Sequence, residues 1–526
     1  MGAARSIPVW REMGAAPAPA GDPETLPVVI VGAGPVGLTL ALDLAQRGHR
    51  IVVLTRLEFI AAGSKAICFS KRSLEIFDRL GVVGPMLAKG VAWNVGKVFW
   101  GIRPAPIYQF DLLPVKDQKH PAFINLQQYY VEEHLVEALR RFPNVEIRWG
   151  HEVASVRQGD SGVHLIAQTR DQTYGLQAAW LIACDGSRSP VRDMMGLDFN
   201  GRTFEDHFLI ADIRTPLDLP PERWFWFDPP FNPGQSALLH KQPDDVWRLD
   251  FQLGGKIDRD ACLKPENVAA LVRGMLGPDT EFTPVWTSLY SFQCRRLARF
   301  VHGRVVFAGD SAQLVSPFGA RGCNGGIAAA DNLGWKLDLV LRGEASPSLI
   351  ESYNEEGIVT ADENILNSSR ATDFLTPKTM VSRAFRDAVL ELAESHSFAR
   401  SFVNSGRLST AVSYPSGQLG TPDTEAWNGG PAPGSPPIDA PFASSWLLDR
   451  IGDQFALLAD GWAHPIPTGV KLIEIGTLPD PALIRLRYDL SPGSAYLLRP
   501  DQYVAARWRA PTPALLHAAL ARAKGR

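Results

Sequence analysis

The chain has 526 residues, of which 45% are hydrophobic and 21% charged, and its net charge is -3 at pH 7. At roughly 100–200 residues per domain, this length allows about three domains with cores of their own. The balanced charge excludes a nucleic-acid-binding protein that depends on a basic face. Five scattered cysteines without a C-x-x-C pair exclude a disulfide scaffold and a cysteine zinc site. We therefore expect a cytoplasmic protein that binds neither metal nor nucleic acid.

Residues 1–24 are rich in Ala, Pro and Gly and lack the apolar centre of a signal peptide, so we expect a disordered tail. The start Gly2–Ser6 fits the short myristoylation pattern, but nothing polybasic supports that alternative. The longest apolar stretch, Leu26–Leu42, is interrupted by glycines and Pro35 and is too short to cross a membrane. The sequence therefore predicts no membrane attachment.

A glycine-rich turn follows the first predicted strand of the folded region. The continuous apolar run Pro27–Val31 is typical of a buried parallel strand, and a helical pattern begins near Pro35. Between them, glycines at 32, 34 and 37 let the backbone approach a pyrophosphate at a helix N-terminus. We therefore expect Gly32, Gly34 and Gly37 to bind a dinucleotide, and a purely structural turn is the alternative.

The second strand, Ile51–Leu54, ends where such a site usually carries a ribose-binding acid. Here the tip of the strand is Thr55-Arg56, and the first acid, Glu58, comes three residues late. We assign Thr55 and Arg56 to the ribose end of the site, as a departure from the usual pattern.

Two further acids stand at the ends of predicted buried strands. Helical spacing covers residues 73–80 and 130–141, and strand patterns cover 145–157, 163–169 and 180–183. Asp185-Gly186-Ser187-Arg188 follows the last of these strands, and Gly309-Asp310 follows the apolar run Val305–Ala308. Either acid alone is often just a helix cap. All three motifs in this order are far more specific for a dinucleotide cofactor.

Between these motifs, residues 198–292 are rich in aromatics and alternate like an antiparallel sheet. Trp224–Phe227 could line an aromatic pocket, with core packing as the alternative, and alternation allows only one pair to face a site. We consider His207, His240 and Tyr290 as proton-transfer groups, each of which could equally be solvated. Arg295 could bind a substrate carboxylate or pair with a core acid.

The last part of the chain is expected to form a small separate domain. After the third motif, a helix is predicted from about Gly325 to Leu341, residues 376–410 look helical, and residues 411–441 form a linker rich in Pro, Gly and Ser. Strands are predicted at 455–458, 471–475, 483–487 and 495–498, and a final helix at 514–523.

With these motifs in hand, residues 26–375 resemble the group A flavoprotein aromatic hydroxylases, which include phenol hydroxylase and, as the most similar branch, 3-(3-hydroxyphenyl)propionate hydroxylase. The tail from about residue 430 resembles the thioredoxin-like domain of phenol hydroxylase relatives. The resemblance implies an α/β fold with a Rossmann-type FAD-binding domain, an inserted antiparallel-sheet substrate domain and a small thioredoxin-like C-terminal domain. The implied bounds are 25–98, 121–198 and 296–375 for the first, 99–120 and 199–295 for the second, 376–430 for a helical segment and linker, and 431–526 for the third.

The resemblance also implies which residues hold the cofactor and which act on substrate. Cofactor-binding residues would be Gly32, Gly34, Gly37, Thr55, Arg56, Lys65, Gln128, Asp185, Gly186, Arg188, Gly309, Asp310, Pro317, Gly319, Gly322, Cys323 and Asn324. Catalytic candidates would be Pro317, His240, Tyr290 and Arg295. Four positions depart from the family pattern: Thr55 replaces a Glu, Lys65 an Arg, Gln313 a His, and Ile67 the active-site Asp of phenol hydroxylase.

As a resemblance, this implies an FAD-dependent monooxygenase that uses NADPH or NADH and O2, through a flavin C4a-hydroperoxide, to hydroxylate a small phenolic or related aromatic substrate. A homodimer is compatible with it. Two alternatives stay open: a reductase or oxidase on the same fold that transfers no oxygen, and a flavin-binding regulatory protein. The sequence does not distinguish NADH from NADPH, nor does it identify the substrate.

Overall fold

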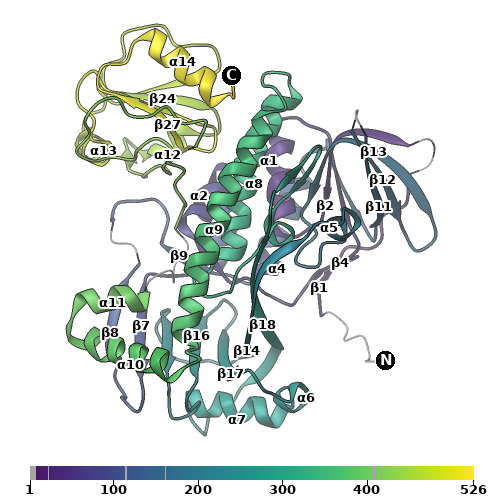
Figure 1. The fold of residues 1–526 in the computed structure, drawn as a ribbon, viewed down its shortest axis with the longest axis vertical. Helices are drawn as coiled ribbons and strands as arrows, with labels where there is room; N and C mark the ends of the chain where they lie inside the picture. The colour runs from purple at the N-terminus through teal and green to yellow at the C-terminus, as the bar shows by residue number, and fades with distance from the viewer. Residues whose placement is uncertain are drawn as a thin grey trace.

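The computed structural model describes residues 8–19, 21, 23–112, 115–159, 162–404, 410–415 and 417–526. Figure 1 shows three parts: a sheet with its helices at upper right, a second sheet below it, and a small C-terminal unit at upper left beside the end of the long helices. This is the α/β class expected from the sequence. Among the described residues, no helix is both long and apolar enough to cross a membrane.

The first sheet, called the Rossmann sheet here, has the strand order β10-β3-β2-β13-β12-β11, with β20 and β19 attached beside β13. Its members are β2 (Glu24–Val31), β3 (Ile51–Thr55), β10 (Val145–Trp149), β11 (Glu152–Gly159), β12 (Gly162–Gln168), β13 (Thr173–Ala183), β19 (Val301–His302) and β20 (Val305–Phe307). Strands β10, β3, β2, β13 and β20 run parallel. The three motif-bearing strands β2, β13 and β20 are therefore neighbours, and their carboxyl ends meet at one edge.

Helices cover the Rossmann sheet on the side of its glycine turn. Helix α1 (Pro35–Gln46) is buried along most of its length, with fully buried leucines such as Leu38 and Leu42. It packs against α8 (Arg321–Leu341) so closely that a Cβ on Gly334 would lie 1.8 Å from the Asp43 carboxylate. Other helices of this part are α2 (Lys71–Arg79), α3 (Val83–Lys89), α4 (Gln128–Leu139), α5 (Pro190–Met194) and α9 (Leu349–Leu375).

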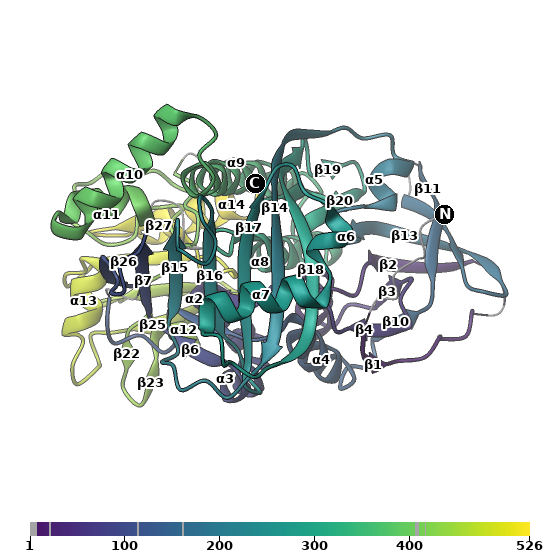
Figure 2. The ribbon, with the colours of Figure 1, turned by 90° about the horizontal axis from the view of Figure 1, so that it is seen from below.

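The second sheet, called the inserted sheet here, has the order β21-β18-β14-β17-β16-β15-β7-β8. Its members are β7 (Val95–Trp100), β8 (Tyr108–Asp111), β14 (Phe199–Arg214), β15 (Arg223–Phe227), β16 (Ser236–Lys241), β17 (Val246–Gly254), β18 (Thr283–Leu297) and β21 (Gln313–Leu314). Helix α7 (Pro265–Leu276) lies across this sheet (Figure 2). Because β7 pairs with β15, residues 95–98 belong to the inserted sheet rather than to the first domain, where they were expected.

Strict alternation sorts the side chains of the inserted sheet into two cores. Leu209, Leu249 and Phe251 pack under α7 together with Val268 and Val272. The opposite face carries a second core, which also includes side chains from α10 (Met380–Ser395) and α11 (Ser397–Asn404). Members of that core include Phe208, Phe225, Phe227, Leu238 and Phe292 of the sheet and Phe318 of the loop after β21.

The C-terminal unit is a four-stranded sheet of order β25-β24-β26-β27. Its strands and helices are β24 (Phe455–Ala459), β25 (Val470–Glu474), β26 (Ala495–Leu498), β27 (Val504–Trp508), α12 (Leu447–Ile451), α13 (Ala482–Tyr488) and α14 (Pro513–Ala523). The strand expected at 483–487 is wrong, because this segment is helix α13. Its buried Ile484 and Tyr488 are four residues apart, which places both on one helical face.

The expectation of a disordered tail is also wrong within the part of residues 1–24 that the structure describes. Strand β1 (Val9–Glu12) pairs with β4 (Phe59–Ala61). Trp10 stacks on Tyr129, with ring centroids 4.2 Å apart, and Arg11 forms an ion pair of 2.9 Å with Glu133. One aromatic and one charged side chain thus anchor a segment whose average composition is typical of disordered chains.

Candidate cofactor and substrate site

The glycine turn between β2 and α1 is shaped by close backbone approach. Gly32 has a φ of +112°, and a Cβ there would lie 2.3 Å from the Cys184 carbonyl oxygen. A Cβ on Gly37 would lie 2.1 Å from the Gly32 carbonyl oxygen. Gly34 differs, since nothing lies within 4 Å of its Cβ position and it precedes α1 without a side-chain cap. The turn therefore leaves open space beside Gly34 at the uncapped N-terminus of α1, which suits an anion.

The end of β3 holds a threonine in place of a carboxylate. Thr55 is buried, and among the described residues its hydroxyl accepts only a long hydrogen bond of 3.4 Å, from the Leu57 amide. Arg56 is exposed. Glu58 does not fill the position of the missing acid, because its carboxylate pairs with Arg170 at 2.8 Å.

Residues 185–188 after β13, called the D-G segment here, are built around a half-buried carboxylate. Asp185 Oδ2 accepts a hydrogen bond of 3.0 Å from the Val191 amide, while Oδ1 has no partner among the described residues. Burial raises the pKa of Asp185. Gly186 has a φ of +85°, as the sharp turn requires. Arg188 is exposed at the mouth of this turn.

Arg192 joins the D-G segment to residues 309–311, called the G-D segment here. Its guanidinium donates to the Ser187 carbonyl at 3.0 Å and to the Ser311 carbonyl at 3.3 Å. Gly309 has a φ of +68°, and its Cβ position is only 3.0 Å from the Val36 side chain of the glycine turn. All three motifs are therefore packed against one another, as their order along the chain predicts.

Asp310 stands beside this junction with a free carboxylate. It is half-buried and accepts no hydrogen bond from any residue that the structure describes. Burial raises its pKa, and the charge of Lys65 opposes that shift. An acceptor-only group in this position suits the hydroxyls of a ribose.

Gln128 and Glu132 form a pair on one face of α4. Gln128 Nε2 donates to Glu132 Oε1 at 2.8 Å, and Gln128 Oε1 accepts from the Ala66 amide at 3.1 Å. Burial raises the pKa of Glu132 to about 7, against the opposing charge of Lys65. The Gln128 amide thus holds the loop that carries Lys65. Glu132 was not among the predicted site residues, although its position four residues after Gln128 placed it on the same helical face.

The loop between β21 and α8 contains strained backbone. Gly319 has a φ of +104° and Ala320 one of +54°, and α8 begins at Arg321, four residues earlier than expected. Pro317 is exposed, and the Gly322 Cβ position meets only Val315 at 3.6 Å. The loop therefore presents backbone rather than side chains next to the first turn of α8.

The side chain of Asn324, in the first turn of α8, is hydrogen-bonded within the protein. Asn324 accepts from the Ser70 amide and donates to the Cys68 carbonyl, each at 2.9 Å. Its side chain therefore fixes β5 (Cys68–Ser70), so only its backbone remains for a cofactor. Burial raises the pKa of the Cys323 thiol, which keeps it neutral.

Phe318 connects this loop to the inserted sheet. Its ring lies 5.0 Å from that of Phe208 and 5.3 Å from that of Phe292, measured between centroids. Phe225 and Phe227 lie on the same face of the sheet, whereas Trp224 and Trp226 pack toward α7. Alternation therefore resolves the aromatic run as expected, with one pair on each side.

Four buried polar residues form one row across this face, called the polar row here. Arg223 is paired in register with His240, His240 with Arg248, and Arg248 with Asp212. Each is at most 4% exposed. Burial and the nearby Arg223 lower the pKa of His240 to about 4, so it is neutral at pH 7. The ring Nε2 lies 3.3 Å from Asp250 Oδ2.

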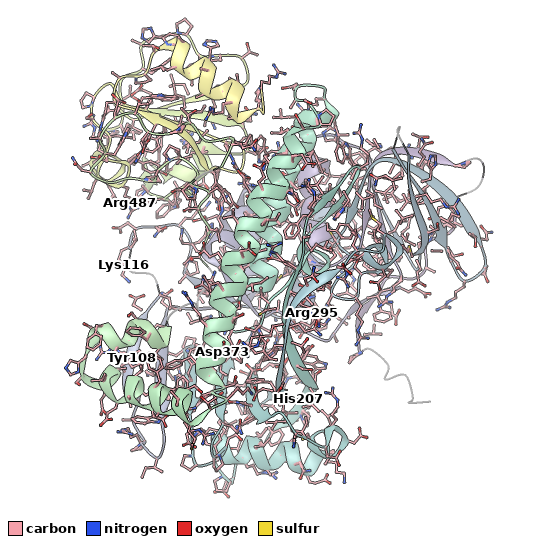
Figure 3. The ribbon with its side chains drawn as sticks, viewed as in Figure 1. Tyr108, Lys116, His207, Arg295, Asp373 and Arg487 are labelled. Atoms are coloured by element: carbon pink, nitrogen blue, oxygen red, sulfur yellow. The ribbon has the colours of Figure 1, made fainter. Side chains whose placement is uncertain are left out.

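The other predicted catalytic residues do not all share this face. Tyr290 opposite Phe208 does, and burial raises the pKa of its hydroxyl. Arg295 lies an odd number of residues away on β18, points to the other face, and donates to the Thr203 hydroxyl at 2.9 Å. His207 sits at a bulge of β14. Figure 3 shows Arg295 and His207 well separated along the strand pair.

An apolar cluster closes the space beside the α8 loop. It contains Ile67, Cys68, Trp93, Ala122 and Phe123, with Ala320 of the loop packed against it. Part of the cluster lies on a three-stranded sheet of order β5-β9-β6, in which β9 is Phe123–Asn125 and β6 is Val91–Trp93. Ile67 is 7% exposed, so no carboxylate occurs at this position of the wall.

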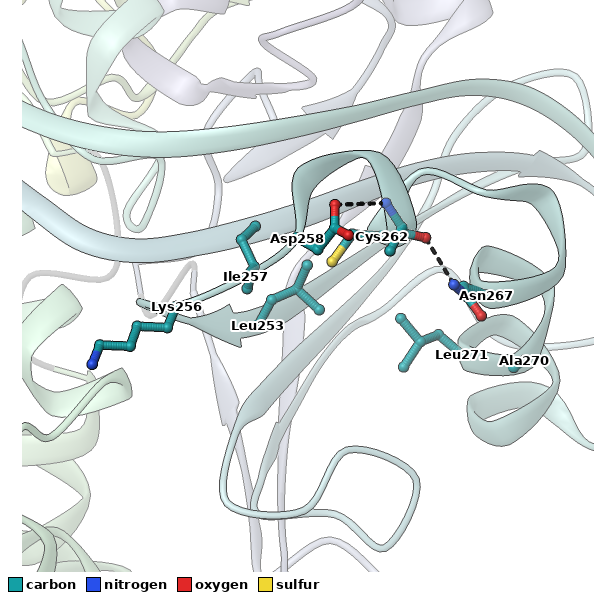
Figure 4. Close-up of a pocket in the computed structure, with 9 residues that line it drawn as sticks. Leu253, Lys256, Ile257, Asp258, Cys262, Asn267, Ala270 and Leu271 are labelled. Atoms are coloured by element: carbon teal, nitrogen blue, oxygen red, sulfur yellow. Dashed lines mark hydrogen bonds between the residues drawn. The ribbon is translucent and has the colours of Figure 1, made fainter.

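A separate pocket at α6 (Arg259–Cys262) and α7 does not belong to this site (Figure 4). Leu253 and Leu271 in its lining are part of the core under α7, on the far face of the inserted sheet. Its polar groups are used locally, since Asp258 caps α6 and Asn267 donates to the Ala261 carbonyl at 2.8 Å.

Known proteins are similar to this chain over most of its length. The FAD binding domain family matches residues 25–368. The 3-(3-hydroxy-phenyl)propionate/3-hydroxycinnamic acid hydroxylase of Paraburkholderia xenovorans is 31% identical over 69% of this chain, a match that spans 57% of that protein. The protein of the same name from Comamonas testosteroni is 29% identical over 81% of this chain and 70% of its own.

Solved structures show the same arrangement of parts. The p-nitrophenol 4-monooxygenase PnpA of Pseudomonas putida DLL-E4 is 26% identical, with a TM-score of 0.65 over 72% of this chain and 97% of its own. The rebeccamycin biosynthetic enzyme RebC, with reduced flavin, is 25% identical with a TM-score of 0.75 over 96% of this chain and 99% of its own. The flavin-dependent monooxygenase PieE shares the fold, with a TM-score of 0.81 at 21% identity over 96% of this chain and 100% of its own.

Proposed function

Because this chain belongs to the FAD binding domain family, we propose that it is an FAD-dependent monooxygenase that uses NAD(P)H and O2 to hydroxylate a phenolic or related aromatic compound. The relatives that it matches over more than two thirds of its length are named as aromatic hydroxylases. Its five cysteines are all free, which is compatible with a reducing cytoplasm.

The residues present fit FAD. The open space at Gly34 lies at the N-terminus of α1, which suits a pyrophosphate. Within the part of the chain that the structure describes, the Asp310 carboxylate accepts no hydrogen bond and the buried Oδ1 of Asp185 has no partner. Unpaired buried acceptors are costly unless a ligand completes them. We assign the pyrophosphate to the α1 amides and the ribose to Asp310.

One observation carries the proposal: the contact of Phe318 with Phe208 and Phe292. It joins the loop before α8, in the cofactor half of the molecule, to the aromatic face of the inserted sheet. A ring bound on that face would therefore lie next to the cofactor loop. A cofactor site without a substrate would not need an aromatic wall at this point.

Bound FAD would supply the redox chemistry, taking a hydride from NAD(P)H and passing one oxygen atom of O2 to the ring. The chain's own contribution is position and environment. The amides of the first turn of α8 would stabilise negative charge on the reduced ring system. The aromatic wall would exclude water. His240 is neutral, and Tyr290 keeps its proton, so either could hold a proton near a substrate oxygen.

The test is a screen of phenols for stimulated NAD(P)H oxidation by the FAD-loaded protein, beginning with 3-(3-hydroxyphenyl)propionate. We expect at least one compound to accelerate NAD(P)H oxidation and to yield a hydroxylated product in comparable amount. Stimulated oxidation with hydrogen peroxide as the only oxygen product would instead identify an oxidase. Firm FAD binding without NAD(P)H oxidation under any condition would favour a regulatory protein.

A further inference from the structure

One cation of the polar row, Arg223, forms no ion pair with any described residue. Arg248 is fully paired, since its Nε and Nη2 each lie 2.8 Å from an oxygen of Asp212. His240 has Asp250 at 3.3 Å. Arg223 has neither: it forms no ion pair within the described part of the chain, and its buried Nε and Nη1 donate no hydrogen bond.

An isolated guanidinium is expensive to bury. Arg223 is 4% exposed, and burial lowers its pKa, yet an arginine keeps its charge at neutral pH. The rings of Phe225 and Trp93, at 4.9 Å and 5.9 Å from the guanidinium carbon, stabilise the charge but accept no conventional hydrogen bond. The charge of Asp250 raises the pKa of Arg223, but Asp250 lies against His240 and accepts no hydrogen bond from Arg223, so a bound anion would complete the guanidinium.

The position of Arg223 places that anion in the proposed substrate site. Its side chain shares the face of the inserted sheet that carries Phe225 and Leu238. The Trp93 ring beneath the guanidinium belongs to the apolar cluster that contacts Ala320, the residue immediately before α8. The Trp93 ring thus lies between Arg223 and the loop before α8, on the side of that loop where we propose that the substrate binds.

We infer that Arg223 binds an anionic oxygen of the aromatic substrate, so that this protein acts on aromatic acids or on ionised phenols rather than on neutral rings. The positive charge attracts an anion, and Nε and Nη1, the two nitrogens left without a hydrogen-bond partner among the described residues, can each donate to an anionic oxygen. This inference rests on the proposed function for the aromatic part of the ligand. The anion site itself depends only on Arg223 and its surroundings.

The experiment measures binding to the FAD-loaded protein by calorimetry, without NAD(P)H, using three probes. These are 3-(3-hydroxyphenyl)propionate, its methyl ester, which keeps only the phenol, and 3-phenylpropionate, which keeps only the carboxylate. If the carboxylate is the anion, both acids bind and the ester binds roughly tenfold to hundredfold more weakly. If the phenolate is the anion, the ester binds and its affinity increases as the pH approaches about 10, while 3-phenylpropionate binds weakly.

Variants tie the preference to this residue. Arg223→Met should abolish the preference for the anionic probe, and Arg223→Lys should retain part of it because the charge remains. Arg214→Met, at an exposed arginine of the same sheet, should change nothing. Arg223→Met should also raise the melting temperature of the ligand-free protein, because an unpaired buried charge is removed.

Equal affinity of the wild-type protein for charged and neutral probes, or an unchanged preference in both Arg223→Met and Arg223→Lys, would overturn the inference. These outcomes are distinct from failure of the proposed function. A protein that prefers the acids through Arg223 but forms no hydroxylated product would keep the anion site and contradict the monooxygenase. Hydroxylation of neutral and charged phenols at equal rates would keep the monooxygenase and contradict the anion site.

Discussion

Phe318 and Phe208 meet edge to face with ring centroids 5.0 Å apart, although they belong to different halves of the molecule. Phe318 is part of the loop that begins α8, and Phe208 belongs to β14 of the inserted sheet. Under the proposed function, the loop before α8 and the aromatic face of the inserted sheet would be two walls of one site.

Removal of the Asp310 carboxylate should weaken FAD binding. A charge-assisted hydrogen bond to a ribose contributes about 1.5–3 kcal/mol, so Asp310→Ala should raise the Kd for FAD roughly tenfold to hundredfold. Fluorescence titration of the flavin-free protein measures this. Asp193→Ala, at an exposed acid of α5, is the matched control and should bind FAD normally. An unchanged Kd in Asp310→Ala would remove Asp310 from the site.

Replacement of Thr55 by glutamate should strengthen FAD binding. Its hydroxyl is a weaker acceptor than a carboxylate, and its one hydrogen bond within the described residues is long, at 3.4 Å. Thr55→Glu should therefore tighten FAD binding, by roughly tenfold if about 1.4 kcal/mol is gained. Glu58→Gln should have no effect, because Glu58 is paired with Arg170. A loss of affinity in Glu58→Gln would show instead that Glu58 reaches the ribose.

Glu132 should make the flavin-free protein less stable as the pH rises. Its pKa is about 7 in the folded protein, against about 4.3 when unfolded, so the folded state holds the proton more tightly. The stabilisation is complete below pH 4 and is lost as the pH rises through 7, on the order of 4 kcal/mol in all. Glu132→Gln should therefore raise the melting temperature at pH 8 much more than at pH 5.

The exposed Glu152 on β11 provides the control for this measurement. Glu152→Gln should shift the melting temperature little, and by the same amount at both pH values. Equal shifts at pH 5 and pH 8 in Glu132→Gln would contradict the assignment, because they would show that Glu132 does not titrate in this range.

Arg188 should serve NAD(P)H rather than FAD. It is exposed beside Asp185, whereas its neighbour Arg192 is buried and bridges two loops. Arg188→Ala should slow anaerobic flavin reduction in stopped-flow experiments while leaving the FAD content intact. Arg192→Ala should lower the FAD content itself. Reduction at full speed in Arg188→Ala would exclude this role.

The same stopped-flow experiment tests control by substrate. Reduction needs the flavin accessible to NAD(P)H, whereas oxygen transfer needs it shielded from water, so a bound aromatic compound should shift the population toward the reducible state. We expect the correct substrate to accelerate reduction at least about tenfold, which corresponds to about 1.4 kcal/mol of differential binding. A compound that is hydroxylated without this acceleration would contradict substrate control.

The sequence contains more local signals for a cofactor site than for a substrate site, for a physical reason. Gly32, Gly37 and Asp310 are local signals, because a tight turn or a strand end needs its residue at a fixed place in the chain. Arg223 was not among the predicted residues. Its position becomes informative only through the register of β15 with β16 and β17, which a single sequence does not contain.

Short segments were the other source of error. Residues 483–487 are apolar enough for either a strand or a helix, and length and periodicity do not decide between them. Trp10 lies in a stretch whose composition predicts disorder, but its stacking on Tyr129 is a tertiary contact. The alternation of Trp224–Phe227 was predicted, although which pair faces the site depends on the placement of α7.

The most direct test of the central claim is the origin of the oxygen in the product. The FAD-loaded protein is supplied with NAD(P)H, an aromatic acid that stimulates NAD(P)H oxidation, and 18O2 in ordinary water, and the product is analysed by mass spectrometry. We predict one 18O atom in each hydroxylated molecule, with the second oxygen atom of O2 leaving as water. A product that contains only oxygen from the solvent, or quantitative release of 18O-labelled hydrogen peroxide with the aromatic compound unchanged, would contradict the account.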